Sequence, residues 1–234
     1  MNKSNFIIGL LLSLVAVHSH ASISLSATRI IYNGMQKEAS INVDNNSDRE
    51  TAIQTWIEGD GDINQAPPFA VTPPLAKIKG NQRQLLRLFY EGRGLPQDRE
   101  SVFWLNVQEI PLAVEGENVL QLALMQRIKV FYRPNGLNGE PYLAPEKLMF
   151  KSVNNNLEVY NPTPYYINMV SFVNVGGDIK GRMIPPMSKI TFSLQKVQPD
   201  GKFTLGIVND FGAVKTYMGE LKEGVASSPV LIKP

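Results

Sequence analysis

Leucines and then cations are regularly spaced in the stretch from Asn118 to Pro134, NVLQLALMQRIKVFYRP. Every second residue of its first half is a leucine: Leu120, Leu122 and Leu124. Three cations follow at odd positions: Arg127, Lys129 and Arg133. In an extended chain, alternate side chains line one face, so the leucines form an apolar ridge. A strand that only closes its own core needs the leucines and has no use for the cations.

Nucleophilic and metal-assisted catalysis lack their usual residues. The chain contains no cysteine, and its two histidines, His18 and His20, lie in the first 21 residues. Residues 1–21 have the layout of a secretory signal peptide: Lys3, an apolar run from Phe6 to Val17, and the small residues Ser19 and Ala21 before the cut. A membrane anchor is the alternative, but twelve apolar residues cannot cross about 30 Å of hydrocarbon. Without that segment, Ser-His-Asp and Cys-His catalysis and His- or Cys-ligated metals are excluded.

Charge and acidic patterns point to neither a nucleic acid nor a metal. Removing Lys3 leaves 23 − 1 = 22 Lys and Arg against 21 Asp and Glu, a net charge of +1. This predicts no nucleic-acid partner. No other apolar run is long enough to span a bilayer, so we also predict no stable membrane insertion. Asp60-Gly-Asp62 begins like a calcium loop, but Gln65 and Val71 stand where glycine and glutamate belong. A pair of carboxylates, as in glycoside hydrolysis, is the one catalytic alternative left open. We therefore predict no enzyme, no metal and no cofactor.

The elements that must position the ridge and the cations are β-strands. Short runs rich in Val, Ile, Phe and Tyr recur between Asn, Gly, Pro and Asp, the first from Ile23 to Tyr32. The Pro- and Gly-rich stretch from Arg133 to Pro141 is the best linker. The prediction is an all-β chain with two immunoglobulin-like β-sandwich domains. Its parts are the signal peptide 1–21, an N-terminal domain 22–140 and a C-terminal domain 141–234.

Five ordered segments of the chain resemble signature blocks of the PapD-like periplasmic pilus chaperones: 26–32 (SATRIIY), 96–101 (PQDRES), 127–134 (RIKVFYRP), 160–166 (YNPTPYY) and 208–212 (VNDFG). The resemblance implies two immunoglobulin-like domains in a boomerang arrangement. It implies a chaperone that binds pilus or fimbrial subunits in the periplasm and delivers them to an outer-membrane usher. Such a chaperone lends a subunit the strand that its own sandwich lacks, which is donor-strand complementation. The alternative is a two-domain Ig-like adhesin or binding module.

The resemblance assigns the opening stretch, at about 118–132, to the family's donor strand, called G1. Leu120, Leu122 and Leu124 match the donated side chains; the alternative is that they complete the chain's own core. Arg29 and Lys129 match a basic pair that binds the subunit's terminal carboxylate; the alternative is two solvated cations. On an ideal strand Lys129 would face away from the leucines, so a local twist or bulge, or a cleft reached from the opposite face, is required.

A second set of residues matches a structural feature of the family. Glu100, Arg133 and Asp210 match an inter-domain salt bridge that fixes the angle between the domains. The short segment from Pro111 to Asn118, together with the missing cysteine pair, resembles the subtype with a short loop before the donor strand. The disulfide of some C-terminal domains is also absent.

Overall fold

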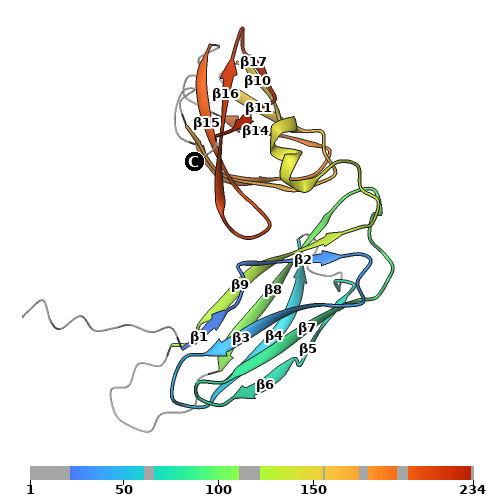
Figure 1. The fold of residues 1–234 in the computed structure, drawn as a ribbon, viewed down its shortest axis with the longest axis vertical. Helices are drawn as coiled ribbons and strands as arrows, with labels where there is room; N and C mark the ends of the chain where they lie inside the picture. Colours follow the sequence, from blue (N-terminus) through green and yellow to red (C-terminus); the bar gives the residue numbers. More distant parts are fainter. Residues whose placement is uncertain are drawn as a thin grey trace, which may run out of the picture.

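The computed structural model describes residues 22–60, 66–110, 122–154, 156–173, 179–193 and 200–232. The described chain is almost entirely β-strand, and its strands form two sandwiches that meet end to end at an angle (Figure 1). The predicted all-β fold with two immunoglobulin-like sandwiches is confirmed. The predicted signal peptide, residues 1–21, lies outside the described residues. Within these ranges no helix is both long and apolar enough to cross a membrane.

The first sandwich packs two sheets against each other. One sheet has the order β1 (Ile23–Leu25), β3 (Ala39–Asn45), β7 (Arg83–Tyr90) and β5 (Phe69–Thr72). The other has the order β2 (Arg29–Asn33), β9 (Met125–Arg133), β8 (Ser101–Ile110), β4 (Thr51–Gly59) and β6 (Leu75–Ile78). The alternation of buried and less buried side chains explains the arrangement: in β3, Ile41 and Val43 are buried, while Asn42 between them is not. The inward-facing side chains of the two sheets form one core.

The first predicted strand, Ile23 to Tyr32, is divided between the two sheets. Its first part, β1, pairs with β3, and its second part, β2, pairs with β9. Ser26 follows the last residue of β1, and its hydroxyl accepts a hydrogen bond from the Asn42 amide at 3.1 Å. The pairing of β2 with β9 is parallel, whereas the other pairings between described strands are antiparallel.

The second sandwich also has two sheets. One has the order β14 (Ser188–Ser193), β11 (Asn156–Asn161), β10 (Met149–Val153) and β17 (Val225–Ser227). The other has the order β13 (Ile179–Ile184), β12 (Ile167–Val173), β15 (Gly201–Val208), β16 (Val214–Leu221) and β18 (Val230–Leu231), and the 3₁₀ helix η1 (Pro141–Lys147) precedes them all. Phe203 lies at the centre, with ring centroids 4.9 Å from Phe150 and 5.1 Å from Phe172. Aromatic burial thus holds together a domain that has no disulfide.

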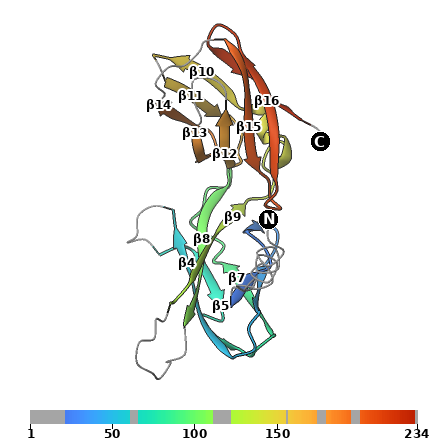
Figure 2. The same ribbon diagram turned by 90° about the vertical axis from the view of Figure 1, so that its left-hand side faces the viewer.

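The hairpin of β15 and β16 connects the two sandwiches in space. Its tip extends from the second sandwich towards β2 and β9 of the first in both views (Figure 1 and Figure 2). A Cβ added at Gly212 in this tip would lie 2.5 Å from Thr28 Oγ1, and Gly212 has a φ of 85°. Only glycine satisfies both conditions easily, so the tip packs closely on the residue that precedes Arg29.

Candidate binding cleft between the domains

Arg29 and Lys129 lie side by side at the junction of the two sandwiches. They are register partners in the parallel pairing of β2 with β9, and both are partly buried. Burial lowers the pKa of the Lys129 ammonium, and the nearby Arg29 charge lowers it further, while Asp60 opposes the change. Burial also lowers the pKa of Arg29, whose Nε is buried without a hydrogen-bond partner. The pair is therefore a partly desolvated positive site with unused donors.

The faces of β9 explain how Lys129 reaches the cleft. The register of β9 with β8 runs without interruption from Met125 to Tyr132, so no bulge turns the strand. Ile128, Val130 and Tyr132 point into the first core. Lys129 therefore points from the outer face of the sheet, where it contacts Trp104. Lys129 therefore lies on the face of the sheet opposite to the core, and β9 carries no bulge between Met125 and Tyr132.

An aromatic side chain supports the cations on this outer face. The Trp104 ring lies beneath two of them, with its centroid 5.1 Å from Lys129 Nζ and 4.5 Å from Arg127 Cζ. Its indole N–H donates to Asp60 Oδ1 at 3.2 Å. Glu58 pairs with Arg127 at 2.9 Å and fixes it beside the ring. Cation–π contact of this kind holds a cation in place without neutralising it.

The three residues matched to an inter-domain salt bridge are in contact. Arg133, at the end of β9, donates from Nε to Glu100 Oε1 at 2.6 Å. Its two terminal nitrogens donate to the two carboxylate oxygens of Asp210 at 2.9 and 3.2 Å. Glu100 is 3% exposed, so its charge requires these partners. Burial raises the pKa of the Glu100 carboxyl, and the Arg133 guanidinium opposes that rise.

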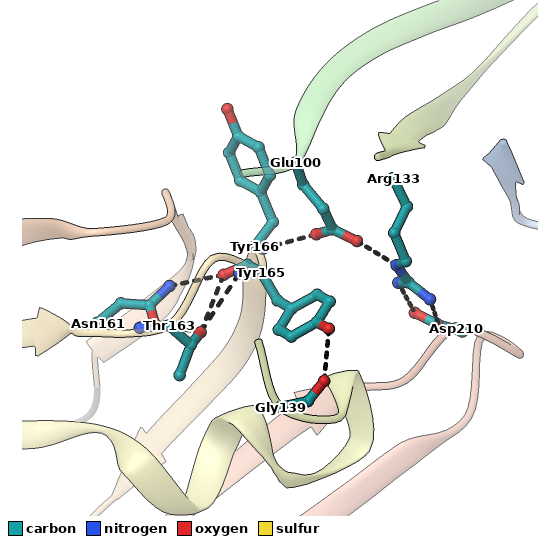
Figure 3. Close-up of polar contacts among 8 residues, drawn as sticks. All are labelled: Glu100, Arg133, Gly139, Asn161, Thr163, Tyr165, Tyr166 and Asp210. Carbon is teal, nitrogen blue, oxygen red and sulfur yellow. Dashed lines mark hydrogen bonds and ion pairs between the residues drawn. The ribbon is translucent and has the colours of Figure 1, made fainter. Parts of the chain in front are cut away.

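Glu100 also fixes a turn of the second sandwich (Figure 3). Its Oε2 accepts from the Tyr166 amide at 2.7 Å, and its own amide donates to the Pro164 carbonyl at 2.9 Å. The neighbouring Tyr165 hydroxyl donates to the Gly139 carbonyl at 2.7 Å (Figure 3), and its ring lies 5.4 Å from Arg133 Cζ. The contacts of Glu100, Arg133 and Asp210, here called the hinge, together with Tyr165, thus join both domains and the segment between them. Sequence reasoning gave Tyr165 no role of its own, although it lies within the quoted block 160–166 (YNPTPYY).

Two leucines of the predicted ridge are exposed. Leu122 is 67% exposed and Leu124 is 51% exposed, and both precede β9 rather than belong to it. In the described residues the predicted donor strand, about 118–132, is a strand only from Met125 onwards. Leu120 and the segment from Pro111 to Asn118 lie outside the described residues. Leu122 and Leu124 therefore do not complete the core of this chain.

Comparison with known proteins decides the family. Residues 22–138 match the model of the pili and flagellar-assembly chaperone, PapD N-terminal domain, and residues 143–219 match that of the pili assembly chaperone PapD, C-terminal domain. The chain belongs to the PapD-like family of pilus-assembly chaperones.

Curated relatives are similar over nearly their whole length. The chaperone is 41% identical to the chaperone protein LpfB of Salmonella typhimurium, over 91% of this chain and 95% of that protein. It is 39% identical to the chaperone protein FimC of Escherichia coli K12, over 90% of this chain and 88% of that protein. The function is that of a periplasmic chaperone in the chaperone–usher pathway of pilus assembly, not that of an enzyme. The alternative of an adhesin module is excluded.

Solved structures of similar chains have the same architecture. The chaperone DraB of E. coli superposes with a TM-score of 0.74 at 33% identity, covering 86% of this chain and 97% of that one. The SafB chaperone of Salmonella enterica, solved in complex with the SafA pilin, has a TM-score of 0.74 at 28% identity, covering 93% and 99%. The arrangement of two sandwiches is thus common to this chaperone and its relatives.

Proposed function

We propose that this chaperone caps pilin subunits by donor-strand complementation and then delivers them to an outer-membrane usher. Leu120, Leu122 and Leu124 would fill the apolar groove of a subunit, while Arg29 and Lys129 bind its terminal carboxylate. The complex of the similar SafB chaperone with a pilin supports a subunit as the partner. The cation pair is the single observation that carries the proposal.

The pair lacks an anion of its own. None of the ion pairs between described residues includes Arg29 or Lys129. Asp210 acts electrostatically on Arg29 and Asp60 on Lys129, but Asp210 pairs with Arg133, and Asp60 accepts a hydrogen bond from the Trp104 indole. Two adjacent, partly desolvated cations are unfavourable until an anion binds them. A carboxylate satisfies this need because the guanidinium and the ammonium can both donate to it.

The strand order indicates how a subunit would approach. Among the described strands, β9 from Met125 to Ile128 pairs with β8 on one edge and with none on the other, because β2 begins at Arg29. A partner strand on that free edge whose carboxylate ends at Arg29 must run in the same direction as β9. The subunit's last strand would therefore lie in line with β2 and end where β2 begins, with backbone pairing along β9.

The leucines supply apolar contact beside that pairing. Burying an exposed leucine side chain contributes about 1.5–3 kcal/mol before ordering costs. Leu122 and Leu124 are exposed in the free chaperone, so this contribution becomes available on binding. Register matters because a shift of one residue turns a ridge to the wrong face. The carboxylate at Arg29 and Lys129 would set that register.

Three finer assignments belong to the same proposal. The chaperone is of the short-loop subtype, since the segment from Pro111 to Asn118 before the donor strand is short and the chain has no cysteine. The Glu100–Arg133–Asp210 bridge orients the domains. Residues 1–21 are a cleaved signal peptide, and the domains divide between 140 and 141.

The test is a charged substitution in the ridge. Leu122→Glu should leave the chaperone folded but abolish co-purification of pilin subunits from the periplasm, since a carboxylate in an apolar groove is heavily penalised. Met35→Glu is the matched control, because Met35 is 72% exposed and lies in the turn after β2. Circular dichroism checks the fold of both variants. A normal subunit yield with Leu122→Glu would overturn the donor assignment.

A further inference from the structure

A polar residue separates the exposed leucines from the core of the first sandwich. Counting every second position, Leu122 and Leu124 are exposed, whereas Ile128 packs on the core and Val130 is fully buried. Gln126 lies between them and is partly buried. Without it, the row from Leu122 to Val130 would be continuously apolar. Gln126 therefore marks the boundary between the exposed leucines, which are proposed for donation, and the side chains that belong to the chaperone's own core.

The Gln126 amide has a defined partner. Its Nε2 donates to the backbone carbonyl of Ile23 at 2.9 Å. Ile23 belongs to the opposite sheet and is 1% exposed, so this bond links β9 to β1 at the end of the sandwich. An apolar side chain at this position would leave the carbonyl without this donor.

A second hydrogen bond joins the same N-terminal segment to β8. The Ser22 hydroxyl donates to the Glu109 carboxylate. The Glu109 amide in turn donates to the Leu124 carbonyl at 2.9 Å, one residue before β9 begins. The N-terminal residues Ser22 and Ile23 are thus linked to both strands at the point where the exposed leucines start.

We propose that Gln126 is a positioning residue for donor-strand complementation. Gln126 and Ser22 together form an N-terminal clamp: their hydrogen bonds to Ile23 and Glu109 hold the start of β9, where the donated segment ends. The proposal rests on the proposed function. The clamp closes the sandwich at Gln126, so Leu122 and Leu124 stay outside the chaperone's own core and remain aligned for a subunit. The Gln126 amide bonds to Ile23 only in this register. Moved inward by two positions, it would be buried against the core without that partner.

Hydrogen exchange in the free chaperone tests the clamp directly. Gln126→Met keeps the length of the side chain and removes the donor. The Glu109 amide, which bonds to Leu124, should then exchange roughly tenfold faster, as expected when a hydrogen bond that restrains local opening is lost. The Leu105 amide in the middle of β8 should keep its rate. Ser22→Ala should have the same local effect.

The matched control is Gln97→Met. The Gln97 amide also donates to a backbone carbonyl, that of Leu95 at 3.0 Å, but it lies in the exposed loop before β8. This variant should leave both exchange rates unchanged. Unchanged exchange at Glu109 in Gln126→Met would overturn the proposal, and so would equal acceleration at Glu109 and Leu105, which indicates global destabilisation instead.

Subunit capture provides a second measurement. Gln126→Met should lower the yield of co-purified pilin severalfold while its unfolding temperature stays close to that of the wild type. A wild-type yield would overturn the proposal. Because exchange is measured without a subunit, a failed clamp leaves the donor assignment intact, and a failed donor assignment would appear only with Leu122→Glu.

Discussion

Arg29 lies directly opposite Lys129 in the parallel pairing of β2 with β9. Two cations in one row of a sheet repel each other, and like charges directly opposite are destabilising. The arrangement costs stability in the free chaperone, since burial and the Arg29 charge both lower the pKa of Lys129. Under the proposed function, this cost is offset when a subunit's terminal carboxylate binds both groups at once.

Removing the Lys129 charge should weaken subunit binding more than the loss of one exposed ion pair would. Lys129→Ala should lower affinity about tenfold to a hundredfold, the equivalent of about 1.5–3 kcal/mol for a charge-assisted bond. Lys129→Met keeps most of the side-chain stem and should be nearly as damaging, whereas Lys129→Arg should partly restore binding. Titration of purified chaperone with a peptide copied from the last strand of a co-purified subunit measures this. A wild-type binding affinity in Lys129→Met would show that the charge of Lys129 is not needed for binding.

The carboxylate itself can be tested by changing the ligand. Amidating the C-terminus of the same peptide should weaken its binding to the wild type and make almost no difference to an Arg29→Ala, Lys129→Ala double variant. The two single variants should together lose more than the double variant does, because both residues bind one group. Equal weakening by amidation in both proteins would mean that these residues hold something else.

Lys129 should also lower stability in a pH-dependent way. Its pKa in the folded chain lies below the ordinary value of 10.5, so between the two values the unfolded chain binds more protons. The free energy of unfolding attributable to Lys129 therefore rises with pH through that window. Lys129→Met should be more stable than wild type at pH 7, and the difference should shrink towards pH 10.5. Urea unfolding at both pH values measures it; a variant less stable at pH 7 would contradict this sign.

The hinge bridge should control the angle between the domains more than the fold of either one. Glu100→Ala removes the partner of Arg133 and the acceptor for the Tyr166 amide, and Asp210→Ala removes the contact of the hairpin tip. Small-angle X-ray scattering should show a changed or broadened shape for both. Asp44→Ala is the matched control, since Asp44 pairs with Arg83 at 2.6 Å far from the hinge. Scattering profiles identical to wild type would argue against the orienting role.

Trp104 should matter because it supports Lys129. Trp104→Leu removes the ring face and should weaken peptide binding roughly threefold to tenfold, in line with a cation–π contact of about 0.5–1 kcal/mol or more. Trp104→Phe keeps a ring face and should lose less. Calorimetric titration compares the two, with Tyr160→Leu as a control, since the exposed Tyr160 lies in β11 of the second sandwich. Equal losses for the Leu and Phe variants would contradict a role of the ring face.

Alternation of apolar residues made the two sandwiches predictable. The sequence also placed Arg133 at the start of the linker and the leucines before the cations. It did not show that Arg29 and Lys129 are neighbours, because 100 residues separate them and their strands pair in parallel. That adjacency was suggested by resemblance to a family, not by periodicity. The break in the first predicted strand was missed because Ser26 to Thr28 interrupt the pattern by only three residues.

The position of Trp104 beneath the cations could not be predicted from the sequence. Trp56 and Trp104 both lie inside strand patterns, where a core position is the commoner one for so large an apolar side chain. The structure instead places Trp104 on the outer face, in contact with Lys129 and Arg127. A side chain's face depends on register with neighbouring strands, which local patterns do not fix when both faces carry large residues.

The position of Trp104 beside Lys129 gives the chaperone an intrinsic fluorescence signal. Trp56 and Trp104 are the chain's two tryptophans, and each donates its indole N–H to an acidic side chain, Glu58 and Asp60 respectively. The tryptophan emission therefore arises from the sheet that carries the cation pair. An anion that draws Lys129 away from the ring changes the electric field at Trp104 and hence its emission. Occupancy of the cleft can thus be followed without any label.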